Sequence, residues 1–253
     1  MPRADPPLYL DCPAPAVAAI RVGVPLRPTA WSGWDALWAV LGSIVIGTAV
    51  AVILLAAGVD LAGPSILLTV MLPWIALAGW PIWVTRRRGN GAEVDLGWRF
   101  QSSDVLKGLI GGAAAFGAAI ISGLVSVWLF GDFSSAAGDQ AAELAQRSGP
   151  AVLVLFAIMV AIGAPIAEEL TFRGLLWSGL AKRGSAAWVP IAVSSLAFAA
   201  IHFEPQRLLV LASVGAVLGV VRWRTGSLGA CVIAHGVNNL PGALGILALI
   251  GTG

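Results

Sequence analysis

Long apolar segments are the feature that most restricts the fold of this chain. A bilayer core is about 30 Å thick and needs roughly 20 apolar residues to cross as a helix. Seven segments meet this criterion, at approximately residues 33–57, 64–85, 108–130, 150–182, 186–203, 207–222 and 227–250. Charged residues make up only 11% of the chain, against about 25% in an ordinary soluble domain. The sequence therefore predicts an all-α, polytopic membrane bundle of about seven transmembrane helices, with eight as the alternative count.

The domain organisation is simple. Residues 1–30 are rich in proline and lack the continuous apolar core of a signal peptide, so we expect an uncleaved N-terminal tail. Residues 31–253 then form one transmembrane domain, without internal repeats. Cys12 and Cys231 are too far apart to indicate a disulfide framework. The net charge of +2 gives no reason to expect a nucleic-acid partner.

Basic residues predict the orientation in the membrane, because cytoplasmic loops carry an excess of lysine and arginine. If the spans alternate, twelve basic residues fall on one side: Arg3, Arg21, Arg27, Arg86, Arg87, Arg88, Arg99, Lys107, Lys182, Arg183, Arg222 and Arg224. The N-terminal tail is thus predicted to be cytoplasmic, and seven spans place the C-terminus on the other side. Two further expectations concern the cytoplasmic face. Trp177, Trp188 and Trp223 should lie at the interface, and residues 89–108 should form an amphipathic surface helix.

The fourth span contains an unusual group of charges. It is too long for one straight span, and Gly163 and Pro165 offer a place for a kink. Glu168, Glu169 and Arg173 follow, although a charge at such depth costs several kcal/mol unless it is compensated. Glu169 and Arg173 are four residues apart and can pair on one helix face, whereas Glu168 points about 100° away. Glu168 is therefore free to act as a general base.

Both histidines of the chain also lie inside predicted spans. His202 follows Phe198 by four residues, and His235 precedes Asn239 by four, so each pair shares a helix face. With a rise of about 1.5 Å per residue, Glu168, His202, His235 and Asn239 lie roughly 21, 25, 12 and 18 Å from the cytoplasmic ends of their helices. The four side chains can therefore meet inside the membrane.

Each of these patterns has a simpler explanation when taken alone. A Glu-Glu-x-x-x-Arg pattern is usually a surface ion pair, and an intramembrane histidine or asparagine usually bonds one helix to another. Gly111, Gly112 and Gly117 of the third span indicate close helix packing. These explanations do not account for the order in which the deep polar residues occur.

That order resembles the CPBP family of intramembrane proteases, the CAAX-prenyl endopeptidases and bacteriocin-processing enzymes also called Abi proteins. Its motifs are EExxxR, FxxxH and HxxxN, present here as "EELTFR" (168–173), "FAAIH" (198–202) and "HGVNN" (235–239). The resemblance places the catalytic core at about residues 150–240 and implies an endopeptidase acting on a membrane-associated peptide or protein. It implies that Glu168 and His202 activate water, and that His235 and Asn239 stabilise the oxyanion. Glu169, Arg173 and Phe198 would support them.

Cofactor, substrate and rival functions stay open at this stage. No cofactor is favoured, and zinc is the alternative, with Glu168, His202 and His235 as its ligands. The Ala/Gly/Trp-rich composition indicates a bacterial inner-membrane protein, where bacteriocin maturation, self-immunity or processing of another membrane peptide is favoured over cleavage of prenylated proteins. Two rival functions are a proton-coupled transporter and a non-catalytic membrane immunity or scaffold protein.

Overall fold

The computed structural model describes residues 26–251, and within that range the chain consists of helices and loops. Most of the expected N-terminal tail, including Cys12, lies outside the described residues. Six of the described helices are long and apolar enough to cross a membrane: Trp34–Ala56, Ile66–Arg88, Ser102–Phe130, Pro150–Ala181, Pro205–Thr225 and Leu228–Ala248. A seventh apolar helix, Trp188–Ala200, is shorter. The predicted all-α polytopic fold is confirmed, and each of the seven predicted spans overlaps one of these helices.

The described residues up to Arg147 form six helices. They are α2 (Trp34–Ala56), α3 (Ile66–Met71), α4 (Trp74–Arg88), α5 (Ala92–Leu96), α6 (Ser102–Phe130) and α7 (Ala136–Arg147). The long fourth span follows as α8 (Pro150–Ile158), η1 (Met159–Gly163), α9 (Ala164–Glu169), η2 (Leu170–Leu176) and α10 (Trp177–Ala181). The chain then ends with α11 (Trp188–Ala200), η3 (Pro205–Arg207), α12 (Leu208–Thr225) and α13 (Leu228–Ala248).

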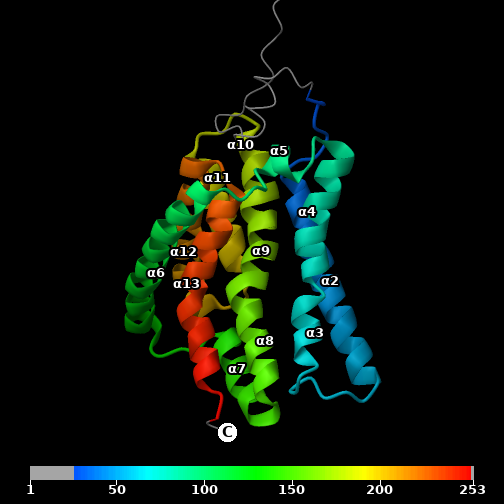
Figure 1. Cartoon of the computed structure of the whole chain (residues 1–253), viewed down its shortest axis with the longest axis vertical. Helices are drawn as coiled ribbons and strands as arrows, with labels where there is room; N and C mark the ends of the chain where they lie inside the picture. The colour runs from blue at the N-terminus through cyan, green and yellow to red at the C-terminus, as the bar shows by residue number, and fades with distance from the viewer. Residues whose placement is uncertain (1–25, 252–253) are drawn as a thin grey trace, which may run out of the picture.

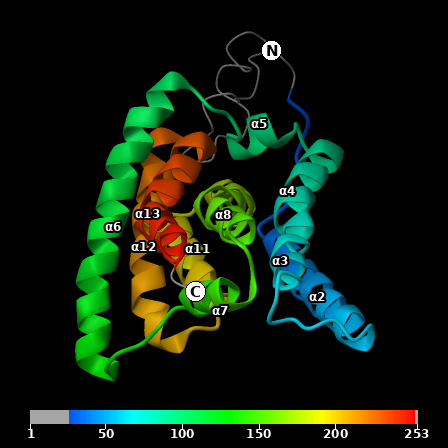
Figure 2. The ribbon, with the colours of Figure 1, turned by 60° about the horizontal axis from the view of Figure 1, so that its bottom comes forward.

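The helices form three groups (Figure 1). The α8–α10 helix runs through the centre, with α2, α3 and α4 on one side and α6, α11, α12 and α13 on the other, as Figure 2 also shows. The last turns of α4 and α12 carry Arg86–Arg88 and Arg222 with Arg224. We call this end of the bundle the basic end. The opposite end, where α7 lies and α13 finishes, is called the α7 end.

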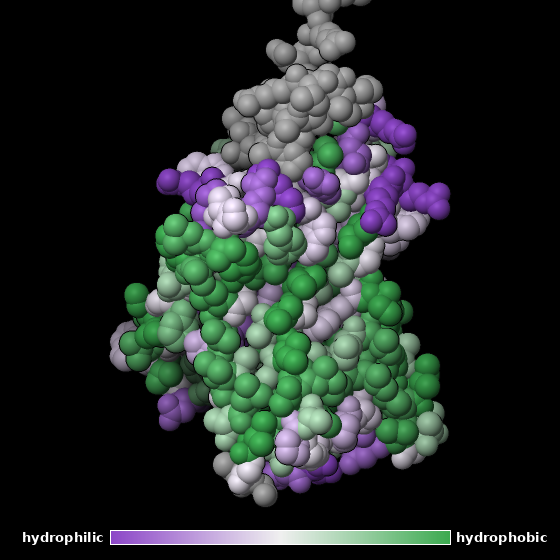
Figure 3. Space-filling view, in the orientation of Figure 1, coloured by the Kyte–Doolittle hydropathy of each residue, from purple (hydrophilic) through white to green (hydrophobic). Residues whose placement is uncertain are grey.

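The surface is that of a membrane protein. On the face shown in Figure 3, hydrophobic residues cover the middle of the molecule, and hydrophilic residues border them at both ends. Large apolar side chains on the outer faces are highly exposed, for example Val45 and Ile53 of α2, with 65% and 66% of their surface accessible. A surface on which so many large apolar side chains are exposed is unfavourable in water but matches a lipid environment.

The central helix carries the predicted irregularity near Gly163, in the form of a wider turn. The helix runs from Pro150 to Ala181, and it is π-helical in two segments: η1 lies before α9 and η2 lies after it. A Cβ atom on Gly163 would lie 2.3 Å from the indole ring of Trp74. Glycine at this position therefore lets α4 pack closely against η1. Such π-helical turns are frequent at functional sites.

Close packing through glycine also joins α6 to α13. A Cβ atom on Gly112 would lie 2.5 Å from Val237, and one on Gly108 would lie 2.5 Å from Ile233. Gly111 is similarly close to Val221 of α12. The prediction of close packing is thus confirmed for Gly111 and Gly112. It was wrong for Gly117, which has open space where its Cβ would be.

The segment after α4 differs from the predicted amphipathic surface helix. Residues 92–96 form the short helix α5, and Asp95 is buried, accepting hydrogen bonds from the Trp31 indole at 2.9 Å and the Asn90 backbone N–H at 2.8 Å. Lys182 lies over the Trp31 ring at 3.4 Å. Burial raises the pKa of Asp95 and lowers that of Lys182 to about 8. Together these contacts tie the residues before α2 to the basic end.

Trp177 was also predicted incorrectly as an interfacial residue. Its side chain is completely buried, and the guanidinium of Arg222 lies 4.8 Å from its ring. Arg222 in turn donates hydrogen bonds to the carbonyl oxygen of Arg173 at 3.0 Å and to that of Leu96 at 3.1 Å. Arg222 therefore stabilises the packing of α12 against the central helix, in addition to its value as a topology signal.

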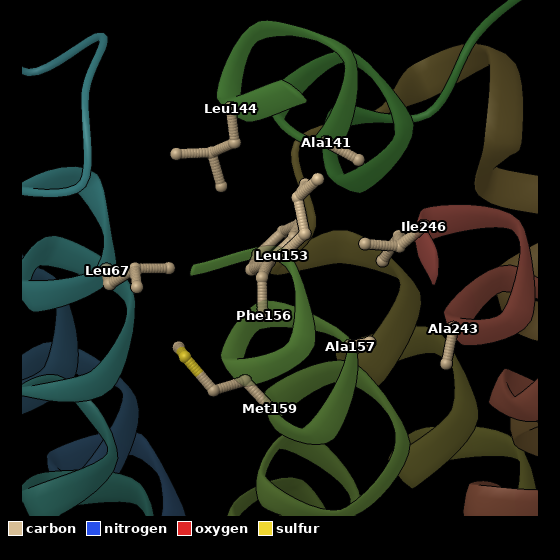
Figure 4. Packing of buried hydrophobic residues seen from close by; sticks show 9 residues of the cluster. All are labelled: Leu67, Ala141, Leu144, Leu153, Phe156, Ala157, Met159, Ala243 and Ile246. Carbon is tan, nitrogen blue, oxygen red and sulfur yellow. The ribbon is translucent and has the colours of Figure 1, made fainter. Parts of the chain in front are cut away.

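A hydrophobic cluster lies at the α7 end of the bundle. Figure 4 shows its side chains converging from α3, α7, α8, η1 and α13. Its members are Leu67, Ala141, Leu144, Leu153, Phe156, Ala157, Met159, Ala243 and Ile246. Arg147 of α7 also pairs with Asp60 of the α2–α3 loop at 3.0 Å. The short helix α7 is thus held against the bundle by one apolar face and one surface ion pair.

Candidate active site

The central helix supplies three charged side chains to the membrane interior. Glu169, the last residue of α9, pairs with Arg173 of η2, with Oε1 and Nη1 2.9 Å apart and both side chains fully buried. The second guanidinium nitrogen of Arg173 donates to the carbonyl oxygen of Gly215 at 2.9 Å. Glu168 points elsewhere and is 14% exposed. The spacing of four residues therefore predicted correctly which glutamate pairs with the arginine.

His235 of α13 lies between the two glutamates. Its Nδ1 is 3.0 Å from Oε1 of Glu169, and its Nε2 is 3.7 Å from Oε2 of Glu168. The Glu169 oxygen that faces Nδ1 is paired with Arg173, and an ionised carboxylate oxygen can only accept. Nδ1 therefore carries the hydrogen and donates a hydrogen bond to Glu169. Nε2 is then the ring nitrogen directed to Glu168. The sequence alone did not predict this contact, because Glu169 and His235 are 66 positions apart and no local spacing relates them.

His202 lies just after α11 and is held by the residue four positions before it. Its Nδ1 donates a hydrogen bond to the carbonyl oxygen of Phe198 at 2.7 Å, which leaves Nε2 as the acceptor nitrogen. The Phe198 ring centroid is 4.8 Å from that of His202 and 5.6 Å from that of His235. The Arg173 guanidinium lies 4.8 Å from the same ring. The Phe198 ring thus lies in contact with both histidines; its supporting role stays a prediction.

Asn239 completes the set from the next turn of α13. Its amide nitrogen donates to the carbonyl oxygen of Val160 in η1 at 3.0 Å. Its carbonyl oxygen accepts a hydrogen bond from Asn238 at 3.0 Å. An amide nitrogen carries two hydrogens, so one remains for a ligand. The π-helical turn η1 therefore orients Asn239 through a backbone contact that the sequence did not reveal.

These side chains share one cavity of about 630 Å³. Glu168, His202, His235 and Asn239 all line it, and its remaining wall is mainly apolar. Glu168 and His202 are not joined by a direct hydrogen bond among the described residues, so their expected cooperation would act on a molecule placed between them. A largely apolar cavity with a few converging polar groups is the usual form of an active site.

The proposed zinc ligands do not form a metal site in the described part of the chain, where no group of three or more His, Cys, Asp or Glu side chains is placed to hold an ion. Nδ1 of His235 faces Glu169 and Nδ1 of His202 faces a backbone carbonyl, so the second ring nitrogen of each histidine, Nε2, stays available to another partner.

A second ion pair at the cavity was missed by the sequence analysis. Glu204 and Arg207, in the connection between α11 and α12, are 2.7 Å apart and both line the cavity. Glu204 was not among the predicted site residues. Its position two residues after His202 was the available signal, because it brings Glu204 to the same cavity.

Comparison with known proteins agrees with the motif pattern. Residues 150–241 match the family model "Type II CAAX prenyl endopeptidase Rce1-like". A curated relative, an uncharacterized 24.3 kDa protein from Escherichia coli, is 36% identical over 95 residues, which cover 36% of this chain and 43% of that protein. The chain thus spans less than half the length of this relative. No solved structure matches. The resemblance predicted from the three motifs is confirmed for the segment that contains them.

Proposed function

We propose that this protein, whose residues 150–241 match the type II CAAX prenyl endopeptidases, is an intramembrane endopeptidase that cleaves a membrane-associated peptide or protein with Glu168 as general base. The family match supports an intramembrane endopeptidase in general. One observation carries the finer proposal: Glu168, His202, His235 and Asn239 line the same membrane-embedded cavity.

In the first step Glu168 accepts a proton from a water molecule held between its carboxylate and Nε2 of His202. The oxygen of that water forms a bond to the carbonyl carbon of the substrate. The carbonyl oxygen becomes an oxyanion, which the free N–H of Asn239 stabilises. His235 contributes when it carries protons on both nitrogens, since Nδ1–H is held by Glu169 and Nε2–H then points into the cavity.

In the second step the proton on Glu168 passes to the nitrogen of the peptide bond. The carbon–nitrogen bond breaks, and the products are a free carboxyl group and a free amine. Glu168 returns to its carboxylate form. Proton transfers of this kind contribute about 10²- to 10⁴-fold to the rate, and a single oxyanion donor contributes about 10²- to 10³-fold.

We propose that the reaction needs no metal, with zinc as the alternative to be tested. Asn239 at the cavity supports the metal-independent reaction, because an asparagine amide is a poor zinc ligand and a good hydrogen-bond donor to an oxyanion. We further propose a bacterial inner-membrane location with a cytoplasmic N-terminus, in line with the basic end described above.

The decisive experiment compares the purified protein with its Glu168→Gln variant on a peptide library in detergent. We expect the variant to lose cleavage by at least about 100-fold while its thermal unfolding is unchanged, because glutamine keeps the shape of the side chain. Glu93→Gln is the matched control, since Glu93 is exposed on α5 and far along the chain from the site. Equal turnover by all three proteins would refute the proposal. Absence of cleavage by the parent would favour the transporter or scaffold function.

A further inference from the structure

The cavity is closed toward the basic end of the bundle. The residues that follow Glu169 in the central helix, Leu170 to Leu175, are all buried. Trp177 and Arg222 fill the next layer and are also fully buried. None of these side chains lines the cavity. A peptide therefore has no path to Glu168 from this end without unpacking the core.

The cavity reaches the surface on its other side. Among its lining residues, those that are exposed come from α6, the start of α7 and the second half of α13, and they are Phe116, Ala136, Pro241 and Gly242. Phe116 is a large apolar side chain with 39% of its surface accessible. Figure 2, in which the α7 end comes forward, shows α7 following α6 and lying near the end of α13. We call these four residues the portal.

We infer that the portal is the entrance for substrate and that it opens to the half of the membrane opposite the cytoplasm. The basic end carries the arginine clusters that mark the cytoplasmic side, so the portal lies toward the other leaflet. The inference rests on the proposed endopeptidase function. It assigns the substrate class: a peptide segment that lies in or on the extracytoplasmic half of the bilayer, such as the tail of an exported or membrane-anchored peptide.

The chemistry of the cavity fits such a segment. Its walls include the apolar side chains Trp74, Phe156 and Met159, which can bury the side chains of a peptide that arrives from lipid. The Glu204–Arg207 pair lies at the same cavity and gives polar groups to the peptide backbone or a chain end.

A thiol reporter inside the cavity tests the portal without relying on cleavage. Ala164→Cys places the reporter one turn from Glu168, in a background in which Cys12→Ser and Cys231→Ala remove the natural thiols. A small, charged, membrane-impermeant thiol reagent is added to intact cells or to inside-out vesicles. Ala119→Cys, on the α6 wall of the same cavity, is the second reporter if the first variant does not fold.

Two tryptophan variants then distinguish the portal from any other route. Gly242 and Gly245 lie on the same helix, are both exposed, and both have open space where a Cβ atom would be, but only Gly242 lines the cavity. We expect the reporter to react at least tenfold faster from the outside of cells than from the cytoplasmic face. We expect Gly242→Trp to slow that reaction at least tenfold, and Gly245→Trp to change it less than twofold.

Faster reaction from the cytoplasmic face, or equal rates in the two tryptophan variants, would overturn the inference. Cleavage is measured in parallel with the same variants. If labelling follows the expected pattern but no peptide is cleaved, the portal stands and the proposed function fails. If peptide is cleaved at equal rates by Gly242→Trp and Gly245→Trp, the function stands and the portal fails.

Discussion

Glu169 is the residue on which the charges of the site converge. One of its oxygens accepts hydrogen bonds from both Arg173 and His235, in a place with no access to solvent. A charge in such surroundings is stable only while its partners remain, because desolvation costs several kcal/mol per ion. We therefore propose that Glu169 is a positioning residue, which fixes the tautomer and the orientation of His235.

We predict that Glu169→Gln and Arg173→Ala each lower both stability and activity. Arg173→Ala strands a buried carboxylate, at a cost of about 3–5 kcal/mol, and thermal unfolding in detergent measures the loss. The control is Arg147→Ala, which breaks the exposed pair with Asp60 and should cost about 0–1 kcal/mol. A positioning role also predicts that Glu169→Gln alters the pH profile of cleavage, because a neutral amide no longer holds the proton on Nδ1. Unchanged unfolding of both buried variants would contradict the assignment.

His235 and Asn239 are predicted to act in the transition state. His235→Ala and Asn239→Ala should each reduce the maximal rate by roughly 100-fold or more, with little change in KM, because each removes a donor to a charge that forms only during the reaction. Steady-state kinetics over a range of substrate concentrations separates the two effects. A raised KM with an unchanged maximal rate would instead place these residues in substrate binding.

Chelation separates the metal-independent mechanism from the zinc alternative. If Glu168 and His202 activate water by themselves, exhaustive chelation should leave activity within about twofold, since general-base catalysis needs no ion. Elemental analysis of the purified protein is the second readout. Stoichiometric zinc that disappears in His235→Ala, together with reversible loss of activity on chelation, would assign the protein to the metalloproteases.

At the level of elements, glycine contacts set how closely α6 approaches α13. A methyl group on Gly112 would overlap Val237, whereas one on Gly117 meets open space. Both glycines lie on α6, but only Gly112 has a neighbouring side chain at the position of an added Cβ atom. Because α13 carries His235 and Asn239, the position of α6 also affects the site.

We predict that Gly112→Ala destabilises the protein by about 1–3 kcal/mol, the usual cost of overpacking, and lowers cleavage by displacing α13. Gly117→Ala is the matched control and should be neutral or slightly stabilising, since alanine favours a helix over glycine. Thermal unfolding of both variants in one detergent provides the comparison. Equal unfolding temperatures would show that the α6–α13 contact yields to an added methyl group.

At the level of the whole molecule, the direction of the bundle in the membrane determines which substrates can reach the site. The basic end should be cytoplasmic, so a reporter fused after Arg183 is predicted to be active in the cytoplasm. One fused after Gly253 is predicted to be active only outside, because α2 begins and α13 finishes at opposite ends of the bundle (Figure 1). A cytoplasmic signal from the second fusion would contradict both the orientation and the portal.

The amino-acid sequence by itself determined the helices and the groups on each of them. Apolar segments of bilayer length define the spans, and a period of about 3.6 residues decides which side chains share a face. The pairing of Glu169 with Arg173 and of His202 with Phe198 follows from this local geometry.

Only the tertiary structure decided which groups of different helices meet. The rotation and axial shift of each helix decide four features of the structure. They are the contact of His235 with Glu169, the close packing at Gly112 but not at Gly117, the burial of Trp177, and the position of the portal. Helical periodicity does not fix these two quantities. They are set by side-chain packing between segments far apart in the sequence, where small residues allow close approach and large ones prevent it.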